Sequence, residues 1–246
     1  MKRITFKLSS LKLKTLKLSS LSLALCLVAS SPAIYAQNTS AAIISVKTET
    51  GNIQVKTIAQ GLENVWGMAF LPDGSMLVTE RAGRMRIVSA AGKVGEPLTG
   101  LPPLYAKGQG GLLDVVLAPD FASSKKIYFS YSEPAEGDAS ELNSTAVSFA
   151  TLNGNKLENL SRVFSQQPKI NSGHHFGSRL VWAPDGTLFI TLGDRYSKKD
   201  SAQTLANHLG KVVRINADGS VPKDNPFINT AGALPEIWSI GHRNMQ

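Results

Sequence analysis

The chain has 246 residues, of which 42% are hydrophobic, and it carries 26 basic and 18 acidic side chains. Six of the basic residues lie within residues 1–36, so the rest of the chain has 20 basic against 18 acidic residues. Because that balance leaves no basic patch, the composition argues against nucleic acid as a partner.

Residues 1–36 have the pattern of a secretory signal peptide. A basic segment without acids is followed by the apolar run 21–29 and by small residues that end at Ala36. The run is far shorter than the roughly 20 residues that a spanning helix needs. We therefore expect cleavage after Ala36, export to the periplasm and no stable membrane insertion.

The single cysteine, Cys26, lies inside this signal. Leu25 precedes it where a lipoprotein signal has a small residue, so we expect no lipid anchor. The mature chain then has no cysteine, which excludes disulfides and thiolate metal sites.

Residues 37–42 are polar and small, and they predict a flexible N-terminus to a domain that covers residues 43–246. In that domain short β-type runs alternate with turn residues, and Thr50-Gly51-Asn52 predicts a hairpin between 43–46 and 53–58. Further strands are expected at 76–79, 85–88, 112–117, 127–131, 146–152, 179–182, 188–192 and 212–216. One short helix is expected at 202–209, ended by Gly210.

A strand–Pro-Asp–strand unit occurs three times, with its turn at Pro72-Asp73, Pro119-Asp120 and Pro184-Asp185. The recurrence of such a unit at about 50 residues is typical of β-propeller blades. Since the spacing is irregular, a β-sandwich stays open as the alternative.

Two Gly-flanked stretches, 171–179 and 241–246, place a histidine and an arginine beside strand-like runs. A neutral imidazole accepts a proton and a guanidinium stabilises an oxyanion, which are the two needs of alcohol oxidation. The sequence has no dinucleotide-binding glycine pattern after a strand and no zinc-ligand spacing.

From about residue 61 to 246 the chain resembles the soluble glucose/sorbosone dehydrogenase family, which uses pyrroloquinoline quinone (PQQ), and within it the bacterial aldose sugar dehydrogenases. Nine motifs carry the resemblance, in the family's order: 65–74 (VWGMAFLPDG), 79–84 (TERAGR), 108–114 (GQGGLLD), 118–121 (APDF), 173–180 (GHHFGSRL), 191–194 (TLGD), 209–216 (LGKVVRIN), 224–226 (DNP) and 241–244 (GHRN).

The resemblance implies an all-β fold, the six-bladed β-propeller of soluble quinoprotein glucose dehydrogenases. At about 50 residues per blade, the chain after residue 36 would supply about four blades. We therefore expect an N-terminal fragment of the propeller that by itself is inactive.

The implied activity is oxidation of aldoses at C1 to the lactone, with hydride transfer to PQQ. By the same resemblance His175 is the general base, while Arg243 and Asn244 contact the quinone. Gln109 and Asp194 are expected to be substrate-binding residues of the pocket. His174 stands where some members have aspartate, and we expect it in the pocket wall. As neighbours on a strand, His174 and His175 would point to opposite faces.

The family also binds calcium beside the quinone, and the resemblance places the calcium ligands after residue 246, so no metal ligand is predicted within the chain. The expected partners are a small-molecule aldose and an external electron acceptor. Two other functions stay open: a propeller hydrolase of the lactonase type, and a non-catalytic propeller that binds carbohydrate. A lactonase needs inward-facing acidic and amide ligands, and a binding protein needs neither His175 nor Arg243.

Overall fold

The computed structural model describes residues 43–137 and 141–246. The signal peptide predicted for 1–36 and the flexible segment predicted for 37–42 lie outside the described residues. The described part is almost entirely β-structure, with one short α-helix, α1 (Phe121–Ser124), and one 3-10 helix, η1 (Lys199–Gln203). In these residues no helix is long and apolar enough to cross a membrane.

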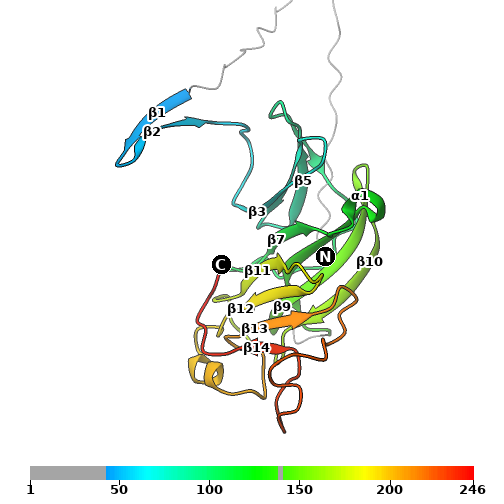
Figure 1. Cartoon of the computed structure of the whole chain (residues 1–246). Coiled ribbons are helices and arrows are strands. Elements are labelled where there is room, and N and C mark those ends of the chain that lie inside the picture. Colours follow the sequence, from blue (N-terminus) through cyan, green and yellow to red (C-terminus); the bar gives the residue numbers. More distant parts are fainter. Residues whose placement is uncertain (1–42, 138–140) are drawn as a thin grey trace, which may run out of the picture. The chain divides into compact units, whose positions relative to one another are not determined.

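The first two strands form the predicted hairpin, in which β1 (Ile43–Thr48) pairs antiparallel with β2 (Gly51–Lys56). Three four-stranded sheets follow, and in each the strands are hydrogen-bonded in chain order (Figure 1). The first contains β3 (Val65–Phe70), β4 (Met76–Glu80), β5 (Arg84–Val88) and β6 (Val94–Pro97). The second contains β7 (Leu112–Leu117), β8 (Lys126–Pro134), β9 (Asn143–Asn153) and β10 (Lys156–Ser165). The third contains β11 (Gly177–Trp182), β12 (Leu188–Leu192), β13 (Val212–Ile215) and β14 (Ile237–Ser239).

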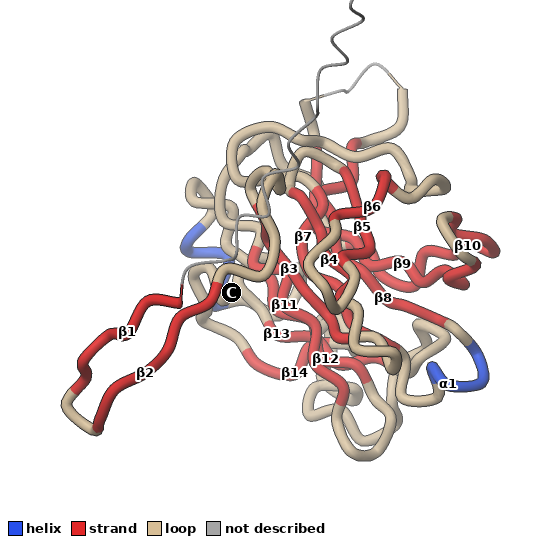
Figure 2. Tube along the Cα trace, turned by 90° about the horizontal axis from the view of Figure 1, so that it is seen from above, coloured by secondary structure: helices blue, strands red, loops and turns tan. Residues whose placement is uncertain are grey.

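The three sheets meet through their first strands, since β7 contacts both β3 and β11 (Figure 2). One hydrophobic core joins the first sheet to the second, with Leu77 packed among residues such as Phe129. Another joins the second sheet to the third, where Val147 and Ile190 are both fully buried. Antiparallel sheets that diverge from adjacent inner strands are the blades of a β-propeller, as predicted.

A hydroxyl group on the second strand of each sheet bonds the first strand of that sheet and a carbonyl of a later segment, which for the first two sheets belongs to the next sheet. Thr79 Oγ1 accepts the N–H of Gly67 at 2.8 Å and donates to the Leu113 carbonyl at 2.5 Å. Ser130 joins Asp114 N–H to the Ser178 carbonyl in the same way, and Thr191 joins Arg179 N–H to the Met245 carbonyl. All three inner strands have their register shift at this point. The repeated unit is therefore a hydrogen-bonded link as well as a sheet, and we call these three groups the hydroxyl bridges.

Asp114 adds a charged connection between the second and third sheets. Its side chain is nearly fully buried and accepts from the Leu180 N–H at 2.9 Å and from the Arg179 guanidinium at 3.0 Å. Burial raises the pKa of Asp114, while these donors act in the opposite direction. Arg179 also lies 4.7 Å from the ring centroid of Trp66 on β3, so residues of three inner strands meet here.

The Pro-Asp repeat is confirmed as the link between the first two strands of every sheet. Asp73 Oδ1 accepts both the backbone N–H and the hydroxyl of Ser75, and Asp185 Oδ1 does the same with Thr187. These bonds close the turn within two residues, which is the local chemistry that aspartate supplies in turns. The middle copy differs, because Pro119-Asp120 leads into α1.

The described residues contain three four-stranded sheets and a separate hairpin, where about four blades were predicted. The difference arises because the second and third sheets, with their loops, take more than the assumed 50 residues, and because the hairpin 43–56 has only two strands. All ten predicted strand runs overlap a strand of the structure. The three outermost strands, β6, β10 and β14, were not predicted, since they are packed on fewer sides and lack a clear alternation of apolar residues.

The helix predicted at 202–209 is wrong. Only η1 occurs here, and it is followed by a bend at 205–207 and a turn at 209–210. The Asn207 side chain accepts the Leu209 N–H at 2.8 Å and donates to Thr204 Oγ1 at 2.6 Å. His208 is buried, with its backbone N–H bonded to the Gln167 carbonyl. Side-chain and long-range bonds thus replace the helical ones.

Candidate active site

His175 lies in the loop before β11, and the backbone around it is closely constrained. It has a left-handed conformation with φ 52, and its N–H donates to Gln109 Oε1 at 2.8 Å. Four of the seven described non-glycine residues with positive φ lie in this region: His175, Ser178, Arg195 and Tyr196. Such conformations cost of order 1–3 kcal/mol each and gather at functional sites.

The imidazole of His175 is paired with a buried carboxylate. Its Nδ1 lies 2.7 Å from Asp194 Oδ1, and both side chains are almost fully buried. Asp194 follows Gly193 at the end of β12, and a Cβ at position 193 would lie 1.9 Å from the His175 carbonyl oxygen. Only glycine permits this approach. A carboxylate that accepts from Nδ1–H leaves a lone pair on Nε2, which is the arrangement of a histidine base.

The segment 241–244 is attached to the same two loops. The Asp194 N–H donates to the Arg243 carbonyl at 2.9 Å, and Asn244 Oδ1 accepts the Gly177 N–H at 2.9 Å. Asn244 thereby keeps its side-chain NH₂ as a donor, and the Arg243 side chain is exposed. Both residues can present N–H donors to acceptor oxygens of a ligand.

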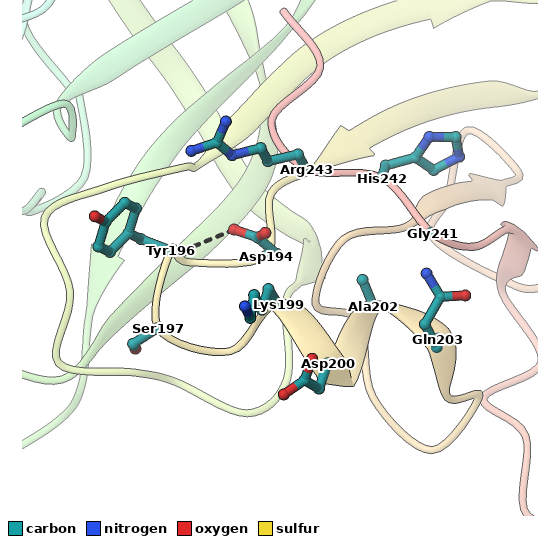
Figure 3. A pocket seen from close by; sticks show the side chains of 10 residues that line it. All are labelled: Asp194, Tyr196, Ser197, Lys199, Asp200, Ala202, Gln203, Gly241, His242 and Arg243. Carbon is teal, nitrogen blue, oxygen red and sulfur yellow. Dashed lines mark hydrogen bonds between the residues drawn. The ribbon is translucent and has the colours of Figure 1, made fainter.

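A cavity of about 610 Å³ lies beside this network, between the loop after β12 and the segment 241–243 (Figure 3). Its walls are mainly polar and carry both signs of charge, from Asp194, Asp200, Lys199 and Arg243. His242 also lines the cavity, and its Nε2 lies 2.6 Å from Ser239 Oγ. Burial and the nearby Lys211 lower the pKa of His242, so this ring is neutral near pH 7.

Five of the six predicted site residues are therefore joined in one network: Gln109, His175, Asp194, Arg243 and Asn244. The sixth, His174, is exposed beside it. The expectation that His174 and His175 point to opposite faces is wrong, because both precede β11 and so are not in a strand. Both rings lie near Tyr196, with centroid distances of 5.6 and 5.4 Å.

Three further residues were not predicted for the site. Tyr196 lines the cavity, and its N–H donates to Asp194 Oδ1 at 2.7 Å. Arg195 is fully buried and donates to the carbonyls of His174 and Asn143 at 3.0 Å each. Nothing in the local sequence distinguishes these two from residues of an ordinary polar loop. The only available signal was their place directly after Gly193-Asp194.

Lys211 is the third, and it holds a segment of the cavity wall in place through hydrogen bonds. Its buried ammonium donates to the carbonyls of Ser201, Ala202 and Leu209, at 3.0, 3.1 and 2.6 Å. Ala202 itself lines the cavity. Burial lowers the pKa of Lys211 to about 8.

Metal ligands are not evident in the part of the chain that the structure describes, where no group of three or more His, Cys, Asp or Glu side chains converges. The acidic side chains of the site are already paired with His175 or lie singly on the cavity wall.

The comparisons with known proteins agree on one family. Residues 62–246 match the family model described as glucose/sorbosone dehydrogenase. Aldose sugar dehydrogenase YliI of Escherichia coli is 45% identical over 197 residues, which cover 79% of this chain and 52% of that protein. The chain thus spans about half the length of this curated relative.

Solved structures agree with the fold. A glucose dehydrogenase crystal structure superposes with a TM-score of 0.71 at 46% identity, covering 75% of this chain and 53% of that one. The PQQ-bound aldose sugar dehydrogenase of Streptomyces coelicolor superposes with a TM-score of 0.66 at 29% identity, covering 77% of this chain and 54% of that one.

Proposed function

Because the chain belongs to the glucose/sorbosone dehydrogenase family, we propose that the protein containing it oxidises aldoses at C1 to the lactone, with PQQ as the hydride acceptor. The observation that carries the proposal is the network of His175, Asp194, Arg243 and Asn244, of which Asp194 and Arg243 line one polar cavity. A relative at 45% identity is an aldose sugar dehydrogenase, and a structural neighbour holds PQQ.

In this mechanism His175 Nε2 removes the proton of the C1 hydroxyl. Asp194 holds the ring through Nδ1 at 2.7 Å and stabilises the imidazolium that forms. Gln109 fixes the backbone of His175, and this orients the base before the sugar arrives. The proton thus leaves the substrate toward a defined atom, the Nε2 of the His175–Asp194 pair.

The residues present fit a quinone, because the Arg243 guanidinium and the Asn244 NH₂ are donors that match carbonyl oxygens. When bound, PQQ would supply the two-electron acceptor that no amino-acid side chain provides. The Arg243 guanidinium would hold an oxygen of that group and would stabilise negative charge on it. An external electron acceptor would complete the cycle. No group of three or more His, Cys, Asp or Glu side chains converges within the described residues, and we propose no calcium ligand among them.

The test is a dye-reduction assay with an aldose, on the full-length protein that contains this sequence, with and without PQQ and calcium. We expect turnover that depends on PQQ, and His175→Ala should lower kcat by about 10²–10⁴-fold with little change in PQQ affinity. Arg243→Ala should weaken both kcat and PQQ binding.

The matched histidine control is His208→Gln, at a histidine whose ring bonds Gln167 and Glu236 and none of the proposed site residues. His208 is buried, with its Nε2 2.9 Å from Glu236, and its loss should lower Tm but spare kcat per folded enzyme. Because the side chain is buried, Tm is measured together with kcat for this variant. Wild-type kcat in His175→Ala would refute the site. Lactone hydrolysis, or sugar binding without turnover, would favour the two alternative functions.

We also propose that the protein acts in the periplasm after cleavage behind Ala36, and that the 246-residue product alone has negligible activity. The support is the signal pattern of residues 1–36 and the coverage of about half of the relatives. Mass spectrometry of the exported protein would show Gln37 as the first residue. An intact Met1, or robust PQQ-dependent turnover by the 246-residue product, would overturn the respective proposal.

A further inference from the structure

Tyr196 is a large aromatic residue that the fold leaves open beside the proposed base. It is 62% exposed, whereas its neighbour Arg195 is 0% exposed. Both have left-handed backbone conformations, with φ 59 for Arg195 and φ 65 for Tyr196. Two consecutive residues in this region are strained unless their surroundings hold them. The exposed ring is therefore attached to a backbone conformation that costs the folded protein conformational energy.

Arg195 provides the anchor for this conformation. Its guanidinium donates to the carbonyl and side-chain oxygens of Asn143 at 3.0 and 2.6 Å, to the His174 carbonyl at 3.0 Å and to the Ser172 carbonyl. It also lies 3.9 Å above the ring centroid of Phe176. Burial lowers the pKa of Arg195 to about 10, so the group stays charged at neutral pH. These contacts fasten the Arg195-Tyr196 turn to the loop that carries His175.

The ring of Tyr196 stands next to the atoms that the mechanism uses. Its backbone N–H shares Asp194 Oδ1 with His175 Nδ1, at 2.7 Å in both cases. The phenol meets the His175 imidazole edge to face, with the centroids 5.4 Å apart and the planes at 76°. Figure 3 shows the ring beside Asp194, at the wall of the cavity that Arg243 also lines. A ring held at one edge in this way keeps its surface available to a ligand.

We propose that Tyr196 is a stacking platform for the pyranose ring of the aldose whose C1 hydroxyl faces His175. This inference rests on the proposed function and names the class of sugar that the site prefers. The face of an aromatic ring is electron-rich and attracts C–H groups that carry partial positive charge. A pyranose with all its hydroxyls equatorial presents an unbroken set of axial C–H groups on each face. Glucose-type aldoses fit this platform, and the axial 4-hydroxyl of galactose interrupts it on the face that carries the axial C–H groups of C2 and C4.

Three variants separate the ring, its hydroxyl and the backbone turn. Tyr196→Phe keeps the ring, while Tyr196→Asn removes it and retains a residue that tolerates the left-handed region. Arg195→Lys keeps the charge but not the planar set of donors, and it tests the anchor. Each is made in the full-length protein and assayed with glucose and galactose, with PQQ affinity measured by titration.

We expect Tyr196→Asn to raise KM for glucose about 10-fold, with a smaller change in kcat, because stacking of this kind is worth about one factor of ten at most. The ratio of kcat/KM for glucose over galactose should fall toward one. Tyr196→Phe should stay within about 2-fold of the wild type, since it preserves the ring face. Arg195→Lys should shift the sugar ratio in the same direction as Tyr196→Asn.

Saturation-transfer NMR with glucose gives a readout that does not need turnover. The axial C–H protons should receive saturation from aromatic protons in the wild type and in Tyr196→Phe, and lose it in Tyr196→Asn. An unchanged KM, sugar ratio and NMR signal in Tyr196→Asn would overturn the platform. So would a loss of PQQ affinity at constant KM, which would assign the ring to the cofactor. If wild-type protein binds no aldose and shows no PQQ-dependent turnover, the proposed function itself fails.

Discussion

At the residue scale, the site is built on buried cations that have carbonyl groups as partners. Arg195 and Lys211 are both fully buried, and the hydrogen bonds given above for each go to oxygens of carbonyl type. A carbonyl dipole compensates a buried charge less well than a carboxylate does. Each of these cations holds several loop carbonyls around one point. One carbonyl partner of Lys211, Ala202, lines the cavity, while the partners of Arg195 belong to the loop that carries His175 and to Asn143.

For Lys211, the free-energy cost of burying the charged ammonium can be measured through the pH dependence of stability. Its pKa falls from 10.5 to about 8 in the folded protein, so between pH 8 and 10.5 the unfolded chain binds more protons than the native one. The contribution of Lys211 to the free energy of unfolding must then rise with pH across that window. Compared with Lys211→Met, the wild type should gain free energy of unfolding from pH 8 to 10.5, by at most about 3 kcal/mol.

Urea unfolding of both proteins at several pH values in this range measures the difference. The comparison cancels other titrating groups that the two proteins share. A difference that stays constant or shrinks as pH rises would show that Lys211 keeps its ordinary pKa in the folded state.

The sequence identified the residues of the site whose motif is local, and it missed those whose role depends on distant partners. His175, Asp194, Arg243 and Asn244 stand in short Gly-containing motifs that sequence comparison can match. Arg195 matters because Asn143 lies next to it in space, 52 residues away in sequence. The misassigned direction of His174 has a related cause, since the strand begins only at Gly177 and alternation does not apply before it.

At the scale of elements, the hydroxyl bridges decide how neighbouring sheets fit together. Each bridging side chain lies on the second strand, opposite the point where the first strand shifts register. The hydroxyl there replaces the backbone hydrogen-bond partner that the shift removes. Thr79 and Ser130 are buried and Thr191 is half-buried, and an unmade bond at a buried group costs about 1–3 kcal/mol. Thr and Ser at positions 79, 130 and 191 are therefore structural in all three sheets.

Ser130→Ala tests this role. The change leaves the Asp114 N–H and the Ser178 carbonyl without their bridging partner, and we expect a loss of about 2 kcal/mol in the free energy of unfolding. Ser123→Ala is the matched control, because Ser123 is an exposed serine on α1 that also donates to a carbonyl, and it should change stability by less than about 0.5 kcal/mol. Equal effects of the two substitutions in chemical denaturation would contradict the role.

Most strands with a buried apolar run were predictable, whereas no range was predicted for β3, which is largely exposed or half-buried, or for the outermost strand of each four-stranded sheet. β7 and β12 have the predicted bounds because their apolar runs are buried between sheets. β10 is mostly exposed along its middle, and its register is interrupted twice against β9, so its sequence carries little periodic signal. The false helix at 202–209 is the opposite case, in which local propensity was overridden by contacts of His208 with Gln167 and Glu236.

At the scale of the whole molecule, the first and third sheets each present exposed apolar side chains. Val65, Met68 and Phe70 on β3 are 51%, 50% and 66% exposed, and they border an apolar cavity of about 440 Å³. Val181 on β11 and Trp238 on β14 are exposed in the third sheet. Apolar surface of this kind favours association.

We expect the 246-residue product to self-associate through the surface of β3. Replacing Met68 and Phe70 together by serine should reduce the associated fraction in sedimentation velocity at equal protein concentration, with little change in Tm because both side chains are already exposed. A matched double variant at exposed polar positions, Lys47→Ser with Gln54→Ser on the hairpin, should leave association unchanged. Undiminished association in the β3 variant would place the contact elsewhere.

The hydroxyl bridges also set an order in which the sheets can be completed. The Thr79 hydroxyl can reach the Leu113 carbonyl only once that later residue is in place, and Ser130 and Thr191 depend in the same way on Ser178 and Met245. In the proposed export the chain would arrive N-terminus first and fold afterwards. Each bridging hydroxyl would then lack this carbonyl partner until the residues that follow its sheet have arrived. A chain that ended just before Ser178 would leave the Ser130 hydroxyl without this acceptor.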